Sequence, residues 1–355
     1  MEWESDKHRA VMATERTQST PPDPPNTAFG RGVTAKEIVG LVIAVVAGLG
    51  MAAQSRVNGE LGGRLDDVVL AAVISFGTGL LLLLLTLVFS ARMRAGLVRV
   101  VPALRAGVLR PWHCLGGFAG ATFVLGQAGT VTLIGVAMFT VGVVAGQTVS
   151  GLAVDRFGLG PAGARALTWP RSLGAALMVA AVGVAVSGDL VDADVERVWA
   201  LVLPVLAGTG MAVQQAFNGR VGEAVGSPLT AALVNFTAGT TLLAVAWVVS
   251  LLFFGNAAPD TLPGEPALYL GGAIGVVFIA VAAVLVSWTG VLLFGLASVA
   301  GQLIGSVVID HVAPATEGGV HATTLLGCAV ALVAVAVAAV GGRRGGGRAL
   351  EESAP

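Results

Sequence analysis

The chain consists of two related apolar halves whose loop charges run in opposite senses. Residues 48–79 align without a gap to residues 208–239, and 12 of these 32 positions are identical. Residues 116–155 align in the same way to residues 271–310, with 14 of 40 positions identical. Many secondary transporters are built from such duplications, with the two copies inserted in opposite orientations.

The amino-acid composition indicates an integral membrane protein. Apolar residues make up 55% of the chain, charged residues make up 12%, and the mean hydropathy is +0.86. A soluble domain would carry about 25% charged residues. The two cysteines, Cys114 and Cys328, form no disulfide or metal-ligand pattern. We therefore expect no metal, no cofactor and no nucleic-acid partner.

Ten stretches are long enough to cross a bilayer core, which needs about 20 apolar residues per helix. They are residues 37–57, 68–90, 112–133, 136–154, 171–188, 199–218, 229–253, 267–288, 291–309 and 322–341. Little polar sequence separates the third stretch from the fourth or the eighth from the ninth. Gly135 and Gly290 stand at these two joins, which predicts tight helical hairpins.

The predicted fold is all-α, with ten transmembrane helices arranged as two inverted five-helix repeats. The first repeat covers residues 37–190 and the second covers residues 199–341. Residues 1–36 are polar and rich in proline, which predicts a disordered cytoplasmic tail. Residues 342–355 form a second predicted cytoplasmic tail.

Loop charges orient the chain in the membrane. The loop at 91–111 carries five arginines and no acidic residue, whereas residues 189–198 and 254–266 are predominantly acidic. Because positively charged loops stay in the cytoplasm, both termini are expected there. Five helices per repeat is an odd number, so the second repeat must enter the membrane upside down. The loop charges agree, because the Arg-rich 91–111 corresponds to the acidic 254–266.

Amides shared by both halves are candidate solute contacts or gates. The motif G-x-G-M-A-x-Q-x-x-x-N-G places Gln54 and Asn58 on one helical face, and Gln214 and Asn218 repeat the arrangement. Gln215 adds an amide in the second half only. Amides also form hydrogen bonds between membrane helices, so solute contact and helix packing both stay open for these residues.

A second shared motif is V-A-G-Q followed eight residues later by an aspartate. It gives Gln147 with Asp155 and Gln302 with Asp310. The two glutamines lie in mid-helix and are further candidates for solute contact. The aspartates fall at helix ends, where a structural role and a coupling or gating role both stay open.

Glycines at four-residue spacing predict close contacts between helices. Gly116 and Gly120 form one such pair, and Gly271 and Gly275 form the corresponding pair in the second half. Small residues at this spacing allow helix backbones to approach each other.

The sequence lacks the motifs of enzymes and of nucleotide-driven pumps. It has no G-x-x-x-x-G-K-[ST], no H-E-x-x-H and no G-x-S-x-G. No charged residue is expected near the middle of a span, where a proton pump or ion exchanger normally has one. We therefore expect the protein not to be an enzyme.

These features together resemble the YdcZ-like branch of the drug/metabolite transporter superfamily, over about residues 38–341. The resemblance implies that a small metabolite or drug crosses the inner membrane by alternating access. It also implies a cavity lined by the first, third, fourth, sixth, eighth and ninth of the ten predicted helices. The amides that these helices carry here are Gln54, Asn58, Gln147, Gln214, Asn218 and Gln302. Related small multidrug exporters use a carboxylate in the first helix, but this chain has Gln54 and no such acid. Their proton-exchange mechanism is therefore not carried over.

We expect a secondary transporter in the inner membrane that moves a small solute, with or without a coupling ion. Its site would lie at the interface of the repeats. A channel or lipid scramblase is one alternative, and a non-transporting membrane scaffold or sensor is another. The expected partners are the solute and the lipid bilayer, and a homodimer stays open.

Overall fold

The computed structural model describes residues 35–161, 163–164, 167–191, 199–254, 257–314 and 320–351. The chain divides into two units, Met1–Ile38 and Val39–Pro355, and the second contains all but the first turn of the described helices. Nearly all of the predicted N-terminal tail lies outside the described residues. The described residues form helices, turns and loops, with no strand among them.

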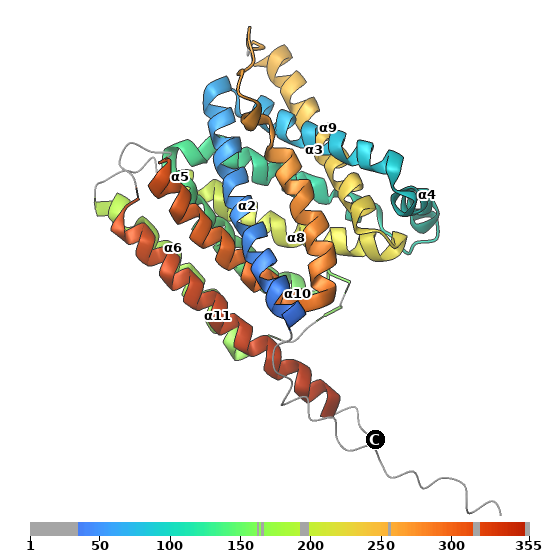
Figure 1. The fold of residues 1–355 in the computed structure, drawn as a ribbon, viewed down its shortest axis with the longest axis vertical. Coiled ribbons are helices and arrows are strands. Elements are labelled where there is room, and N and C mark those ends of the chain that lie inside the picture. The colour runs from blue at the N-terminus through green and yellow to red at the C-terminus, as the bar shows by residue number, and fades with distance from the viewer. Residues whose placement is uncertain are drawn as a thin grey trace, which may run out of the picture. The chain divides into compact units, whose positions relative to one another are not determined.

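The helices follow one another along the chain with short connections (Figure 1). Their bounds are α2 Ala35–Leu65, α3 Val68–Phe89, α4 Ala91–Arg105, η1 Pro111–Leu115, α5 Gly116–Arg156, α6 Trp169–Val191, α8 Val202–Val225, α9 Pro228–Phe253, η2 Pro266–Tyr269, α10 Gly271–Val312 and α11 Ala322–Glu351. Within the described residues, six segments are long and apolar enough to cross a membrane.

Helix α5 is a hairpin of two helices. Its 41 residues would extend about 60 Å as one straight helix, twice the bilayer core. Gly135 interrupts it with φ 79° and ψ 164°. The rings of Phe123 and Phe139 lie 5.9 Å apart, whereas a straight helix would separate them by about 24 Å. The chain therefore folds back at Gly135, as the glycine at this join predicts.

Helix α10 folds back in the same way. It has 42 residues, and the rings of Phe278 and Phe294 lie 5.9 Å apart. These two phenylalanines correspond to Phe123 and Phe139 in the alignment of the halves. The chain must reverse between them, in the interval that contains the predicted join at 288–291.

Equivalent turns connect the first two helices of each half. Asp66 has φ 51° after α2, and Gly226 has φ 71° after α8. Asp67 then caps α3 by accepting a hydrogen bond from the Leu70 amide at 2.9 Å. Ser227 caps α9 in the same manner. Oxygen-bearing side chains at this position satisfy backbone donors that the first helical turn leaves unpaired.

Helix α4 corrects the prediction of a loop at 91–111. Met93 is buried, while Arg92 and Arg99 donate to the carbonyls of Gly226 and Val225 at 3.2 and 3.4 Å. These carbonyls end α8, where cations are favoured. A search for apolar stretches of about 20 residues misses this helix because it has 15 residues, four of them arginine.

Helix α2 extends to Leu65, well past its predicted end at residue 57. Glu60 and Arg64 therefore lie inside the helix. Glu60 pairs with Arg56 at 3.4 Å and with Arg64 at 3.1 Å, one helical turn away on either side. These ion pairs stabilise the helix through a charged segment. Hydropathy alone places the end of the helix at that segment.

The last helices of the two halves, α6 and α11, lie side by side (Figure 1). Gly327 of α11 faces Ala181 and Ala185 of α6, and Met178 is buried in the same cluster. Helix α11 continues to Glu351, beyond the predicted end at 341.

Candidate amide site and arginine cavity

The two halves contact each other through glycines at equivalent positions. A Cβ built on Gly48 of α2 would overlap the carbonyl of Ser298 in α10. A Cβ on Gly208 of α8 would overlap the carbonyl of Val143 in α5. Exchanging the halves converts the first contact into the second, because residues 48 and 143 align with residues 208 and 298.

The same reciprocity holds where α5 meets α9 and α10 meets α3. Gly117 lies directly against the carbonyl of Asn235, and Gly272 lies directly against that of Ser75. The predicted packing glycines also lie at contacts between helices. Gly116 faces Asn235, and Gly271 faces Ser75. Gly120 faces Gln214 of α8, and Gly275 faces Gln54 of α2.

Phe76 of α3 and Phe236 of α9 mark the centre of this arrangement. Their ring centroids are 5.0 Å apart with an interplanar angle of 35°. Both rings are buried, and each is the aligned counterpart of the other. A residue that touches its own counterpart lies close to the axis that relates the halves.

The predicted glutamines face the opposite half across these glycines. A Cβ on Gly275 would lie 3.1 Å from Gln54 Nε2, and a Cβ on Gly120 would lie 2.8 Å from Gln214 Nε2. Both glutamine side chains are buried. The absence of a side chain on each glycine makes room for an amide that reaches across the interface.

In the first half, three polar side chains form a buried network between α2 and α5. Asn58 Nδ2 donates to Gln127 Oε1 at 2.7 Å, and Gln127 Nε2 donates to Ser55 Oγ at 2.8 Å. Asn58 and Gln127 are both 0% exposed. This network is continuous with the packing of Gly59 against Val131.

The second half lacks this network. Gln127 corresponds to Ala282, and Ser55 corresponds to Gln215, which is exposed. Asn218, the counterpart of Asn58, is half-buried and makes no side-chain hydrogen bond among the described residues. Gln214 Nε2 instead donates to Asn235 Oδ1 at 3.1 Å.

Several buried polar atoms around these amides have no hydrogen-bond partner among the described residues. They are Gln54 Oε1, Asn58 Oδ1, Ser75 Oγ, Gln214 Oε1 and Asn235 Nδ2. An unpaired buried polar atom costs about 1–3 kcal/mol, so such groups favour a polar ligand or water that would pair with them.

The glutamines of the second motif lie elsewhere on the helices. Gln147 and Gln302 are half-buried, and neither side chain forms a hydrogen bond within the described part of the chain. The glycine before each packs against a backbone carbonyl, Gly146 against Val205 and Gly301 against Val45.

The two aspartates both have structural partners. Asp155 pairs with Arg171 at the start of α6. Asp310 is 6% exposed and accepts hydrogen bonds from the amides of Val136 at 3.0 Å and Ala137 at 2.7 Å. Asp310 therefore caps the helix that begins after the break at Gly135, instead of being solvated at a helix end.

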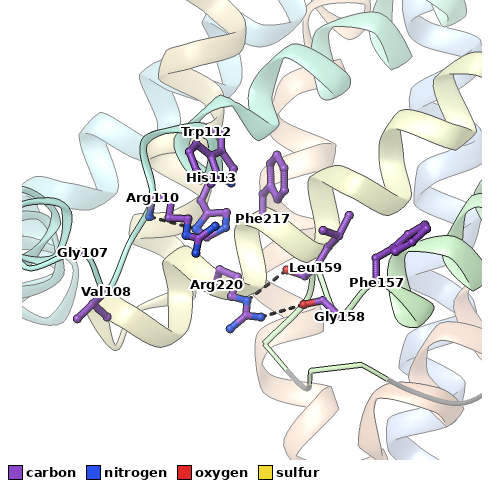
Figure 2. A pocket seen from close by; sticks show the side chains of 10 residues that line it. All are labelled: Gly107, Val108, Arg110, Trp112, His113, Phe157, Gly158, Leu159, Phe217 and Arg220. Carbon is purple, nitrogen blue, oxygen red and sulfur yellow. Dashed lines mark hydrogen bonds between the residues drawn. The ribbon is translucent and has the colours of Figure 1, made fainter.

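A cavity of about 500 Å³ opens where three segments meet, and we call it the arginine cavity (Figure 2). The segments are the residues just before α5, the residues just after α5 and the last turns of α8. Its charged and aromatic lining residues are Arg110, Trp112, His113, Phe157, Phe217 and Arg220. In the described part of the chain, no three His, Cys, Asp or Glu side chains come together as metal ligands.

One family matches the chain in both halves, over residues 39–184 and 199–337. Its description is "Putative inner membrane exporter, YdcZ". The chain belongs to this family. Comparison with curated proteins and with solved structures gave no match.

This YdcZ-family protein has functional candidates that the sequence did not single out. Gln127, Ser55, Ser75 and Asn235 were missed because identity between the halves was the criterion, and none of them is identical to its counterpart. An amide in the middle of an apolar run, as at Gln127, is the signal that would have found the first of them.

Proposed function

We propose that this YdcZ-family member is a secondary transporter that moves a small solute across the inner membrane by alternating access. Its site would lie at the interface of two inverted five-helix repeats. The observation that carries the proposal is the reciprocal placement of Gln54 against Gly275 and of Gln214 against Gly120. Two halves that exchange equivalent contacts can form two states of similar energy, which alternating access needs.

The hairpins in α5 and α10 support a count of five helices per repeat. With an odd number, the halves have opposite orientations, and the arginines of α4 lie on the cytoplasmic side. Both termini are then cytoplasmic. Helix α2 ends at the outer surface, and α8 ends at the inner surface.

The difference between the halves supports one conformational state in particular. At the outer end, α2 is held to α5 by the buried bonds among Asn58, Gln127 and Ser55. At the inner end, Asn218 is half-buried, and the arginine cavity opens beside it. This is the pattern of an inward-facing transporter with its outer side closed, and the outward-facing state would exchange the two ends.

Counterflow in proteoliposomes tests the proposal. Solutes that stabilise the purified protein in a thermal-shift screen would be loaded inside vesicles, and labelled solute would be added outside. A carrier accumulates label transiently against its gradient. Equilibration without an overshoot would indicate a channel or scramblase, and no flux of any bound solute would indicate a scaffold or sensor.

A reversible cross-link tests the alternating mechanism itself. A Cβ on Gly63 of α2 lies 3.4 Å from Thr132 Cγ2 of α5, so Gly63→Cys with Thr132→Cys is placed for a disulfide. Cys114 and Cys328 would first be replaced by Ala. Oxidation should stop counterflow and reduction should restore it, whereas either single cysteine should have no effect. Full counterflow in the oxidised protein would mean that α2 and α5 do not separate.

A further inference from the structure

The arginine cavity carries two positive charges that no described carboxylate neutralises. Four ion pairs occur within the described residues, and none of them includes Arg110 or Arg220. No acidic residue lines the cavity. An anion that enters would therefore meet positive charge without competition from a resident acid.

Backbone carbonyls hold Arg220 in place. Its Nε donates to Leu159 at 3.2 Å, and its Nη2 donates to Gly158 at 3.0 Å (Figure 2). These bonds fix the guanidinium plane and leave the donors of Nη1 for a ligand. A preorganised guanidinium loses little side-chain entropy when it binds a carboxylate.

Aromatic rings form the apolar wall beside these charges. The Arg110 guanidinium lies 5.2 Å from the centre of the Trp112 ring. His113 lies between Trp112 and Phe217, with ring centroids 6.0 and 5.3 Å away. Such a wall favours a flat apolar body, and about 500 Å³ is within the size range of small-molecule sites.

We propose that the arginine cavity binds a small aromatic carboxylate from the cytoplasmic side. The carboxylate pairs with Arg220 and Arg110, and the ring packs among Trp112, His113 and Phe217. This inference deepens the proposed function, because the ligand would be the transported solute or an analogue of it. Arg220 lies six residues after Gln214 on α8, about 9 Å along the helix.

The residue that aligns with Arg220 in the first half carries the opposite charge. Arg220 aligns with Glu60, which pairs with Arg56 and Arg64. An anion is therefore attracted at the inner end, while Glu60 offers it no binding charge at the outer end. This difference suits uptake of an anion from the cytoplasm and its release outside.

Binding of three probes with the same ring system tests the inference. The probes are 2-naphthoate, neutral 2-naphthalenemethanol and cationic 2-naphthylmethylammonium, titrated calorimetrically into the purified full chain. We expect naphthoate to bind at least tenfold more tightly than the other two. Arg220→Gln and Arg110→Gln should each weaken naphthoate binding about tenfold or more. Arg105→Gln removes an exposed charge outside the cavity and should leave binding unchanged.

A salt titration of the unaltered protein covers the case in which Arg220→Gln fails to fold. Naphthoate affinity should fall several-fold between 50 and 500 mM NaCl, whereas affinity for the neutral probe should not. Equal affinity for the three probes, or naphthoate binding that does not respond to salt and to Arg110→Gln, would overturn the inference.

The two proposals fail in different ways. Charge-selective naphthoate binding that depends on Arg110 and Arg220, without counterflow of any solute, would leave the cavity assignment standing and refute transport. Counterflow of another solute by a protein that does not bind naphthoate selectively would refute the cavity assignment alone.

Discussion

Gln127 has no amide counterpart in the second half, yet it makes two of the buried hydrogen bonds that join α2 to α5. Gln127→Leu would leave Asn58 Nδ2 and the Ser55 hydroxyl without this partner. We expect a loss of about 1–2 kcal/mol in the free energy of unfolding, measured in detergent. Gln215→Leu is the control, because Gln215 is exposed and should tolerate the change. Equal stability of both variants would mean that the network adds nothing.

Asp310 offers a test that separates a structural role from coupling. Asp310→Ala removes both acceptors of the Val136 and Ala137 amides, which lie at a helix start. Loss of an N-cap costs about 0.5–2 kcal/mol, so we expect a lower melting temperature. A variant that melts normally but no longer transports would instead assign Asp310 to ion coupling.

At the scale of elements, the hairpin in α5 depends on a glycine. Gly135 has φ 79°, and a Cβ there would lie 2.9 Å from Asp310 Oδ2. We expect Gly135→Ala to lower the free energy of unfolding by about 1–3 kcal/mol. Gly151→Ala in the same helix is the matched control, because a Cβ there meets nothing within 4 Å. Its expected effect is neutral or stabilising by up to about 1 kcal/mol. Similar melting of the two variants would contradict the strain at Gly135.

The apolar helices could be predicted from the sequence, but the arginine-rich helix α4 could not. The stretch predicted at 68–90 is α3, Val68–Phe89, because a mostly apolar sequence without a charged residue lies between its turns. Helix α4 was missed because its stability comes from a narrow apolar face and from arginines on the carbonyls of α8. That docking depends on a segment more than 100 residues away.

Part of the candidate site could likewise be predicted from the sequence, and part of it could not. Duplication identified Gln54 and Gln214, because both halves keep the amide at the interface. It could not identify the arginine cavity, where Arg110 and Arg220 come from segments far apart in sequence. Neither arginine aligns with an arginine in the other half, so comparison of the two halves does not mark either residue.

At the scale of the whole molecule, the proposed inverted arrangement predicts which surfaces a membrane-impermeant thiol reagent can reach. Thr261→Cys lies in an exposed segment before α10, and Ala95→Cys is exposed on α4. In cells expressing the chain without its natural cysteines, we expect labelling of Thr261→Cys from outside. Ala95→Cys should react only after the membrane is permeabilised. Equal labelling of both in intact cells would contradict the inverted repeat.

In the alignment of the two halves, Arg220 corresponds to Glu60, and this difference has an evolutionary consequence. If two identical five-helix chains assembled head to tail, every side chain would occur once at each surface, and the passage would be electrically the same from both sides. Joining the copies into one polypeptide allows each to mutate alone. In the proposed transporter, the divergence at this position gives the two ends of the passage different charges, which no pair of identical chains can have. Gene fusion thereby allows each end to adapt separately to the solute that it meets.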